Sequence, residues 1–442
     1  MTSLASTTVA LLSWNGRSHL ESCLEALDRQ LDPGVAWEVA VLDNGSSDGT
    51  SEWLAREWPA ERRLGASRTG RLRTLRSESN LGFCAGNNLL VDATEADAVV
   101  LLNNDTRPEP DWLGSLVGAL GGAAADVAAV SGLIVDWEGE RLDFAEGSMT
   151  FDGHAFQRHY HRPLGEVALP PEGCELLFAC GGNMAVRRRS FLEAGRFDER
   201  YFAYLEDVDL GWRLWSGGER IVLSKGARVH HRSMATSEML GTWNRGYLFE
   251  RNAFLTAYKN YDPQLWPQLM PAVLLTLLAR TQAMLVRNNP GGGLLEIDPY
   301  DPPPPSAETD VPSRLGAPRG RGLLGGFRGA LRGARRRAAA WLEPGPRAGT
   351  VRLDDPRSLA QLQAVSNLLG GLGPAAAARE RVQARRRRAD AEIFARFPLL
   401  LVPTYPGDEA LFADPGFRSW LPAGLAVEER TLAELMCLET GE

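Results

Sequence analysis

The chain has 442 residues, of which 44% are hydrophobic and 24% are charged, and its formal net charge is −8 at pH 7. A prior of about 100–200 residues per domain predicts two or three domains with enough apolar side chains for a large core. The negative charge argues against general attraction to nucleic acid. Five scattered cysteines without CxxC spacing indicate reduced thiols rather than a disulfide framework.

The apolar segments do not predict a secreted or membrane-spanning protein. The N-terminal stretch MTSLASTTVALLSWN has no basic residue ahead of its apolar run, so a signal peptide is not expected. Residues 269–286 form the longest apolar window, which Arg280, Thr281 and Gln282 interrupt. This window is expected to form a packed helix, with an interfacial helix as the alternative. We therefore expect a cytoplasmic protein.

From residue 7 to residue 104, strands alternate with helices. Buried strands are expected at residues 7–14, 37–44 and 97–104, and a basic loop over residues 61–75 is expected to lead into a short strand. Helices are expected at about 18–30 and 51–58, and residues 80–94 are expected to open with glycine-containing turns and become a helix. This alternation favours parallel βαβ units, in which ligands bind beyond the carboxyl ends of the strands. Asn15, Asp43, Asn44 and Asp105 all follow or end such strands, which indicates a site at one edge of the sheet.

The remainder of the chain is less regular. Residues 143–166 predict a hairpin or a long loop, and residues 175–231 predict a strand, a short helix, an acidic helix at about 206–216 and a final strand. Helical segments from about residue 261 precede a proline-rich loop at about 288–318. We expect one domain at residues 1–260 and a mainly helical region at 261–442.

Two arginine-rich segments, residues 319–337 and 379–388, lie in the C-terminal region. The first alternates arginine with Leu, Phe and Gly. It is either a solvated charge run or a contact with anionic lipid, which would place the protein at the inner face of the plasma membrane. No nucleic-acid recognition motif or stacking platform accompanies it, so nucleic acid is not an expected partner.

Asp105 and the pair His230–His231 each have two interpretations. Asp105 either caps a following helix, because Pro108 and Glu109 suit a first turn, or holds a divalent cation that bridges phosphate oxygens. Histidines are usually structural, but a pair beside a candidate metal site is also a plausible source of a ligand. Mg²⁺ and Mn²⁺ both accept oxygen ligands, and Mn²⁺ tolerates imidazole.

The acidic helix offers a candidate general base. Asp209 and Arg213 are spaced to form an i,i+4 surface pair. That pairing does not account for Glu206 and Asp207 at the start of the helix, where the helix N-terminus favours an ionised carboxylate. Such a carboxylate can act as a general base. Asp43 belongs either to turn chemistry or to binding of a base N–H or ribose hydroxyl.

Several motifs follow one another in chain order: LLSWNGRSHLESCLEAL, VLDNGSSDGT, NLGFCAGNN, LLNNDTRPEPDWL, CGGNMAVRRRSFLEAGRFDERYFAYLEDVDLGWR and ARVHHRSMA. In this order they resemble family 2 glycosyltransferases of the GT-A fold, most closely the rhamnosyltransferase-like members that build bacterial cell-envelope polysaccharides. The resemblance covers about residues 7–258. It implies a Rossmann-like α/β fold with a mostly parallel sheet flanked by helices, and it makes residues 1–260 the catalytic domain.

The resemblance also implies roles for the motif residues. Asp105 would hold Mn²⁺ or Mg²⁺ against the donor diphosphate, with His231 as the late metal-ligating histidine. Asp207, in the Glu206–Asp207 motif, would be the general base for the acceptor hydroxyl. Asp43 would bind the pyrimidine base. The implied nucleotide-sugar-binding set is Ser13, Asn15, Asp43, Asn44, Asn80, Gly82, Asn103, Asn104, Gly181 and Gly182. The metal motif departs from strict DXD, since Asn103 is neutral.

The implied reaction is an inverting single displacement. It would move rhamnose or another sugar from a UDP- or dTDP-sugar to a hydroxyl of a cell-envelope glycan, a lipid-linked acceptor or a secondary metabolite. A sugar-nucleotide pyrophosphorylase is disfavoured, because SWNGRSHLE is not a Gly-rich loop. A non-catalytic nucleotide-sugar-binding scaffold is the alternative, and the presence of Asp105, Glu206 and Asp207 favours an enzyme.

Overall fold

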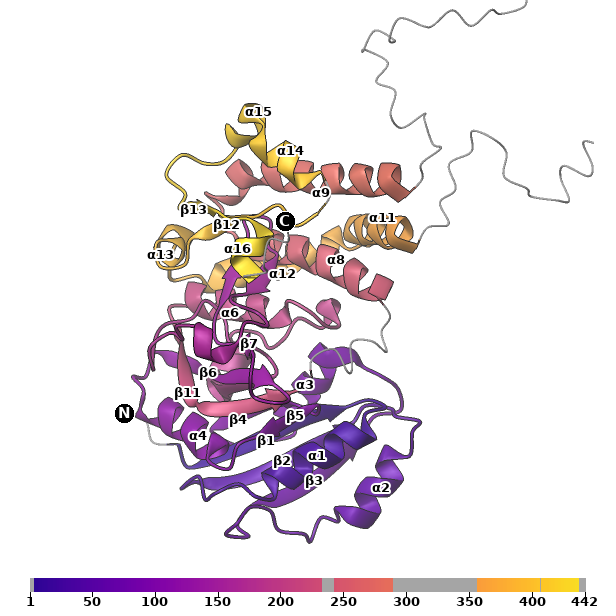
Figure 1. The fold of residues 1–442 in the computed structure, drawn as a ribbon, viewed down its shortest axis with the longest axis vertical. Coiled ribbons are helices and arrows are strands. Elements are labelled where there is room, and N and C mark those ends of the chain that lie inside the picture. The colour runs from indigo at the N-terminus through magenta and orange to yellow at the C-terminus, as the bar shows by residue number, and fades with distance from the viewer. Residues whose placement is uncertain (1–3, 233–241, 289–355, 406, 437–442) are drawn as a thin grey trace, which may run out of the picture. The chain divides into compact units, whose positions relative to one another are not determined.

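A computed structural model describes residues 4–232, 242–288, 356–405 and 407–436 (Figure 1). The chain divides into two compact units, residues 1–281 with 360–442, and residues 282–359. Residues 289–318 of the predicted proline-rich loop and the arginine-rich segment 319–337 lie outside the described residues.

The secondary structure follows the predicted alternation in the first part of the chain. Its elements are β1 (Ser6–Ser13), α1 (Arg17–Leu27), β2 (Ala36–Asp43), α2 (Thr50–Glu57), β3 (Arg71–Arg76), α3 (Gly82–Asp92), β4 (Ala98–Asn103), β5 (Thr106–Pro108), α4 (Trp112–Gly122) and β6 (Val127–Asp136). Next come β7 (Leu142–Phe144), β8 (Gly147–Met149), β9 (Ala155–Gln157), η1 (Leu164–Glu166), β10 (Asn183–Arg187), α5 (Arg188–Glu193), η2 (Glu199–Tyr201), α6 (Glu206–Ser216) and β11 (Arg220–His231). The C-terminal elements are α8 (Thr242–Asn260), α9 (Trp266–Asn288), α11 (Pro356–Gly370), α12 (Leu372–Arg385), α13 (Asp390–Phe394), β12 (Leu399–Leu401), α14 (Asp408–Ala413), α15 (Pro415–Arg418), β13 (Val427–Glu429) and α16 (Leu432–Met436).

A nine-stranded sheet forms the centre of the first unit, in the order β3-β2-β1-β4-β10-β6-β11-β5, with β7 paired to β6. Strands β3, β2, β1 and β4 are parallel, as are β6 and β11. The pairs that involve β10, β5 and β7 are antiparallel. The predicted α/β fold of the GT-A class is confirmed, with parallel strands in its first half and a mixed arrangement in its second.

The central strands are apolar on both faces because helices cover the sheet. Val9, Ala10 and Leu11 of β1 and Val100 and Leu101 of β4 have no exposed surface. Figure 1 shows β1, β2 and β3 with α1 and α2 at one end of the first unit. The register pairs Ser13 with Asp43 and Leu12 with Asn103, so the polar strand ends lie beside one another.

Two local expectations are corrected. Asp105 is followed by the short strand β5, and the next helix begins only at Trp112 with Asp111 as its N-cap, so Asp105 is not a helix cap. Asp209 and Arg213 form the predicted pair at 2.8 Å, but they are buried rather than on the surface. Of the two alternatives expected for residues 143–166, a hairpin or a long loop, the structure contains the hairpin β8–β9.

The C-terminal elements pack against α6 and α8. Trp212 of α6 makes edge contacts with Tyr261 and Phe394, and its indole N–H donates to Asp390. Within the arginine run 379–388, Arg379, Arg386 and Arg388 are partly buried in this packing, whereas Arg381, Arg385 and Arg387 are exposed. Arg388 donates to the carbonyl groups of Trp215, Gly218 and Glu219, at the end of α6.

The same run supplies partners for the end of α8. Arg379 donates to the carbonyl groups of Tyr258 and Tyr261, and Arg386 donates to that of Asn260. The last carbonyl groups of a helix have no partner within the helix, so these side chains cap α6 and α8. The C-terminal region therefore stabilises the helix that begins with Glu206 and Asp207.

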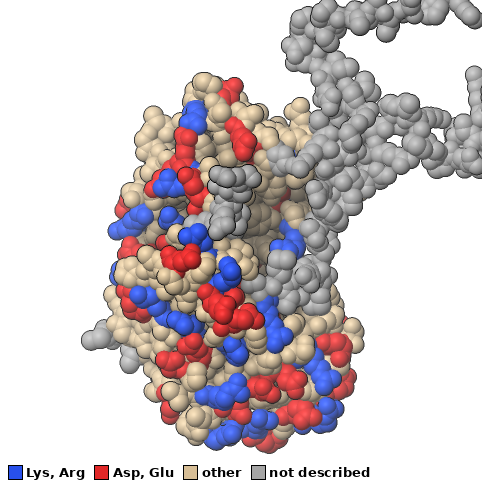
Figure 2. All heavy atoms as spheres, viewed as in Figure 1, with Lys and Arg blue, Asp and Glu red and all other residues tan. Residues whose placement is uncertain are grey.

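Helix α9 contains a 20-residue segment, Trp266–Leu285, that is long and apolar enough to cross a membrane, with a mean hydropathy of 1.2. Of its most apolar 18 residues, 33% are buried within the protein. Leu269 and Arg280 on this helix are buried, whereas Leu274 and Leu278 are exposed. On the face of the protein shown in Figure 2, acidic and basic side chains are interspersed.

Candidate active site

A cleft of about 650 Å³ opens at the carboxyl ends of β1, β2 and β4. The predicted site residues that line it are Asn44, Asn80, Gly82, Asn103, Asn104, Asp105, Gly181, Gly182, Glu206, Asp207 and His231. Ser13, Asn15 and Asp43 do not line the cleft. Ser13 Oγ accepts a hydrogen bond from Asn104 Nδ2 at 3.0 Å, which joins it directly to the cleft wall.

Asp43 lies at the end of β2 with 1% of its surface exposed. Its Oδ1 accepts a hydrogen bond from the Ser46 backbone N–H at 3.0 Å. Its buried Oδ2 lies 3.9 Å from Arg76 Nε and has no hydrogen-bond partner among the described residues. Asn15 Oδ1 accepts from the Ser47 backbone N–H at 2.8 Å and ties the end of β1 to the same turn. Asp43 thus has a carboxylate oxygen that can accept a further N–H.

Asn44 fixes the loop before α3. Its Oδ1 accepts from the Leu81 backbone N–H at 3.0 Å, and its Nδ2 donates to Asn80 Oδ1 at 3.0 Å. Gly82 has a φ of +81°, and a Cβ there would lie 2.5 Å from the ring of Phe202. Only glycine therefore allows Phe202 to pack against this loop.

Asp105 and His231 meet across the β5–β11 pair. His231 Nε2 lies 3.4 Å from Asp105 Oδ1, and His231 Nδ1 lies 2.8 Å from Asp143 Oδ2. The structure places His231, rather than His230, against Asp105, since His230 Nδ1 faces the carbonyl oxygen of Trp137. Burial lowers the pKa of His231, but hydrogen bonds to Asp105 and Asp143 outweigh it and raise the pKa to about 10.

These residues fit a divalent cation. Asp143 can accept the proton on His231 Nδ1, which leaves Nε2 directed at Asp105, the arrangement by which a carboxylate orients a metal-binding histidine. A carboxylate with one imidazole suits Mn²⁺ or a related ion. Among the described residues no group of three or more His, Cys, Asp or Glu side chains is placed to hold a metal. The other ligands would therefore come from substrate oxygens, water or amide oxygens.

Asp207 lies in the first turn of α6. Its Oδ2 accepts from the Gly181 backbone N–H at 3.1 Å, and its Oδ1 accepts from that of Val208 at 2.8 Å. Burial raises the pKa of Asp207, and these backbone donors reduce that effect. Burial, followed by the charge of Asp207, raises the pKa of Glu206 well above its usual range. Of the two carboxyls Glu206 has the more strongly raised pKa, and the backbone donors to Asp207 favour its ionised form, so Asp207 is the better candidate for a base.

One wall of the cleft was not predicted from the sequence. Phe156 and Gln157 of the β8–β9 hairpin, Tyr160, and Arg245 and Phe249 of α8 line it. The rings of Phe156 and Phe249 meet edge to face at 6.3 Å. Arg245 and Phe249 are four residues apart on α8, so they share a face of that helix. No local pattern marks these residues, because the wall is assembled from distant segments.

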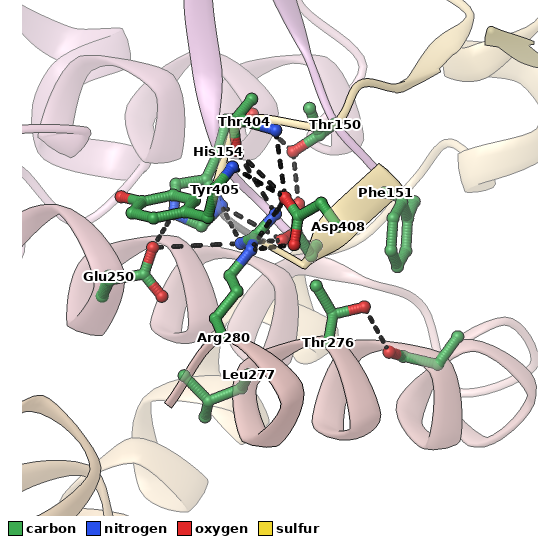
Figure 3. A network of polar contacts seen from close by, with 12 residues as sticks. Thr150, Phe151, His154, Glu250, Thr276, Leu277, Arg280, Thr404, Tyr405 and Asp408 are labelled. Carbon is green, nitrogen blue, oxygen red and sulfur yellow. Dashed lines mark hydrogen bonds and ion pairs between the residues drawn. The ribbon is translucent and has the colours of Figure 1, made fainter. Parts of the chain in front are cut away.

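A buried network behind this wall holds the hairpin against α8 (Figure 3). His154 Nε2 lies 2.9 Å from Glu250 Oε1, although the two residues are 96 positions apart in the chain. His154 lies two residues before Phe156, and Glu250 directly follows Phe249. Their contact therefore fixes the relative position of the two aromatic side chains.

The fold and the cleft define an α/β protein of the GT-A class, and comparison with known proteins identifies its family. The Glycosyl transferase family 2 model matches residues 8–195. N-acetylglucosaminyl-diphospho-decaprenol L-rhamnosyltransferase of Mycobacterium tuberculosis (strain ATCC 25618 / H37Rv) is 31% identical over 243 residues, which cover 52% of this chain and 76% of that protein. The chain belongs to glycosyltransferase family 2, and the predicted likeness to rhamnosyltransferases is confirmed.

More distant proteins are also similar. The O-antigen biosynthesis protein RfbC of Myxococcus xanthus is 27% identical over 239 residues, which cover 52% of this chain and 17% of RfbC. The structure of the mannosyltransferase PcManGT from Pyrobaculum calidifontis, in complex with GDP-Man and Mn²⁺, aligns with a TM-score of 0.44 and 15% identity. That alignment covers 84% of this chain and 88% of PcManGT.

Proposed function

We propose that the protein transfers rhamnose or a related sugar from a pyrimidine nucleoside diphosphate to a hydroxyl of a lipid-linked or cell-envelope glycan, with inversion. The observation that carries this proposal is that the Asp207 carboxylate and the Asp105–His231 pair line one cleft. A base for the acceptor and a site for the donor diphosphate are thereby present together. The family and its rhamnosyltransferase relative support the same reaction class.

The donor base is proposed to be uracil or thymine. The N3–H group of either base can donate to a carboxylate oxygen, and Asp43 has a buried Oδ2 without a hydrogen-bond partner among the described residues. Asn15 and Ser13 lie on the neighbouring strand end and would approach the ribose. This recognition would favour UDP- and dTDP-sugars.

Asp105 and His231 are proposed to hold Mn²⁺ or Mg²⁺, with Asp143 orienting His231. A bound cation would neutralise the negative charge that develops on the departing diphosphate. Asn103 contributes a neutral amide where a second carboxylate would stand in a strict DXD motif. The metal site would therefore depend on the diphosphate for part of its affinity.

Asp207 is proposed to take the proton of the acceptor hydroxyl as the hydroxyl oxygen bonds to the anomeric carbon. The bond from that carbon to the diphosphate oxygen breaks with its electron pair leaving on the diphosphate. The N–H groups of Gly181 and Val208 hold both oxygens of Asp207 in place during proton transfer. One displacement without a protein nucleophile gives inversion.

The aromatic wall formed by Phe156, Tyr160 and Phe249 is proposed to receive the acceptor, because aromatic faces suit sugar rings and apolar chains. The name of the mycobacterial relative specifies a diphospho-decaprenol acceptor, and Arg245 in the same wall would suit an acidic group of such an acceptor. The protein would then work at the cytoplasmic face of a membrane. Flotation with liposomes that contain anionic lipid tests this location.

A thermal-shift panel tests the donor site. UDP, dTDP, GDP and CDP would each be added with Mn²⁺, with Mg²⁺ and with EDTA. We expect a cation-dependent rise in Tm with a pyrimidine diphosphate, and a flat response to all four nucleotides would contradict the proposal. The Asp207→Asn variant should keep this shift while sugar transfer falls by about 10²–10⁴-fold. Transfer at the wild-type rate would remove Asp207 from the role of base.

A further inference from the structure

A second cavity, of about 580 Å³, lies between η2, α8, α11 and α12. This volume is within the range of about 300–1,000 Å³ that is usual for small-molecule sites. Its lining residues are Arg200, Arg251, Leu255, Gln363, Ser366, Asn367, Leu368, Gly370, Gly371 and Pro374. None of these described residues is acidic, and two are arginines. The cavity shares no lining residue with the catalytic cleft.

Arg251 is a buried cation with neutral partners. The residue is 7% exposed. Its guanidinium donates to the hydroxyl of Tyr247 at 2.8 Å and to the carbonyl oxygens of Arg200 and Tyr201 at 2.6 and 3.0 Å. It also donates to the side-chain oxygen of Asn252, at 3.0 Å from Nε and 2.9 Å from Nη2, and to that of Asn367, at 3.5 Å from Nη1. Among the described residues no carboxylate lies within ion-pair distance of it. Burial of a charge without a counter-ion is costly, so an anion that replaced Asn367 Oδ1, the longest of these contacts, would supply the missing negative charge.

Arg200 adds a second donor. Its Nε and Nη2 atoms bind Asp198, whereas its Nη1 atom is buried and has no hydrogen-bond partner among the described residues. The first turn of α12 also borders the cavity, and its N-cap, Gly371, offers no side-chain cap. The N–H groups of such a turn favour negative charge.

We propose that this cavity is a binding site for a phosphate or diphosphate group, held by Arg251 and Arg200. The chemistry is that of an oxyanion with several acceptor oxygens, which arginine donors bind strongly. Ser366 and Asn367 add a hydroxyl and an amide at the rim. The site stands on its own contacts and does not depend on the proposed sugar donor.

The site is linked to the catalytic cleft through the loop before α6. Arg251 binds the carbonyl groups of Arg200 and Tyr201, and the neighbouring Asn252 donates to those of Tyr201, Ala203 and Tyr204. Phe202, Ala203, Tyr204 and Leu205 line the catalytic cleft. An anion that fixes Arg251 therefore restrains the loop that leads into Glu206 and Asp207.

Isosteric variants test the site in the full-length protein. Asn367 Oδ1 lies 3.5 Å from Arg251 Nη1, so Asn367→Asp places a carboxylate where the anion would bind. Gln363→Glu adds a carboxylate at another point of the rim. Gln268→Glu is the matched control, since it adds the same charge at an exposed position of α9 outside the cavity.

Pyrophosphate is titrated calorimetrically in EDTA, which suppresses binding at the metal site. We expect the wild-type protein and Gln268→Glu to bind it with equal affinity, and each cavity variant to bind about tenfold more weakly or worse. Absence of binding to the wild type, or equal binding by all four proteins, would overturn the proposal. The nucleotide-dependent Tm shift, measured with Mn²⁺ on the same proteins, reports the donor site separately.

Farnesyl diphosphate in the same titration distinguishes the sources of the anion. Binding at least tenfold tighter than pyrophosphate, and still weakened by Asn367→Asp, assigns the site to a lipid-linked diphosphate. Equal affinity of the two probes assigns it to free phosphate compounds. Farnesyl diphosphate binding that Asn367→Asp and Gln363→Glu leave unchanged would mean that the cavity is not the site.

Discussion

Arg280 of α9 is surrounded by carboxylates in a buried network, and we expect Arg280→Met to lower the free energy of unfolding by about 3–5 kcal/mol. The Arg280 side chain is 2% exposed, and its guanidinium nitrogens lie 2.6 Å from a carboxylate oxygen of Asp152, 2.9 Å from one of Asp408 and 3.9 Å from one of Glu250. Figure 3 shows Arg280 reaching from its helix toward Asp408, Tyr405 and His154. These partners come from the β8–β9 hairpin, from α8, and from the start of α14 with the residues just before it.

The magnitude follows from the groups that would lose their counter-ion. Asp152, Glu250 and Asp408 are 4%, 3% and 1% exposed. After removal of Arg280, His154 would be the one cation left in this network among the residues that the structure describes. Burial raises the pKa of Asp152, but Arg280, followed by His154, outweighs burial and brings the net pKa well below its usual range. Methionine fills similar space without charge, so the loss is chiefly electrostatic. Against a typical stability of about 5–15 kcal/mol this is a large fraction.

Urea unfolding followed by circular dichroism measures the effect, and hydrogen exchange in β8, β9 and β12 localises it. Arg189→Met is the matched control. Arg189 also pairs with a glutamate, at 2.6 Å, but its side chain is 87% exposed, so its loss should leave the free energy of unfolding nearly unchanged. If the two variants were equally stable, the network would not be holding the hairpin and the C-terminal segment together.

Three further predictions address the metal site, the cleft wall at Gly182 and the pH dependence of stability. Asp143→Asn should weaken Mn²⁺ binding by about 10–100-fold, because His231 loses the carboxylate that orients it. The measurement is a manganese titration of the nucleotide-dependent Tm shift, and a midpoint equal to that of the wild type would contradict the prediction. Gly182→Ala would put a Cβ 2.8 Å from Asn103 Nδ2 and should slow sugar transfer by up to about 10²-fold. Gly118→Ala is the control: its Cβ would meet no atom within 4 Å, so this variant should retain the wild-type rate. Burial lowers the pKa of His154, but Asp152 and Glu250 outweigh it and raise the pKa from 6.5 to about 9. Protonated His154 therefore stabilises the folded state fully below about pH 6.5, and this contribution is lost as the pH rises through about 9. Between these pH values the urea midpoint of unfolding should fall more for the wild type than for His154→Gln.

The parts of the site that the sequence predicted are those encoded locally. Asp43 and Asp105 follow apolar strands, and Asp207 opens a helix with apolar periodicity. Parallel strands bring their carboxyl ends to one edge, so the position of each acid along its own strand was enough to place Asp43 and Asp105 at the same edge of the sheet. The short strand β5 after Asp105 was missed, because Thr106–Pro108 pairs with β11, which is distant in the chain.

The parts that were not predicted depend on such distant pairings. Asp143 has no motif around it and becomes relevant only because β7 and β11 both pair with β6, which brings it to His231. Phe156 and Phe249 belong to a hairpin and a helix that meet through His154 and Glu250. Periodicity reports which face of an element is apolar, but not which other element covers it.

The C-terminal region shows why a change in sequence character need not coincide with a break in packing. The boundary predicted at residue 260 separates an alternating α/β pattern from helical and arginine-rich sequence. In the structure, Arg386 donates to the carbonyl oxygen of Asn260, and Arg388 caps α6, whose first turn carries Asp207. Trp212 on the same helix has no exposed surface once Phe394 and Tyr261 pack on it. The residues that cap and cover the catalytic helix thus come from beyond the motifs that reveal its chemistry, so its stability should be sensitive to substitutions at Arg388 and Phe394.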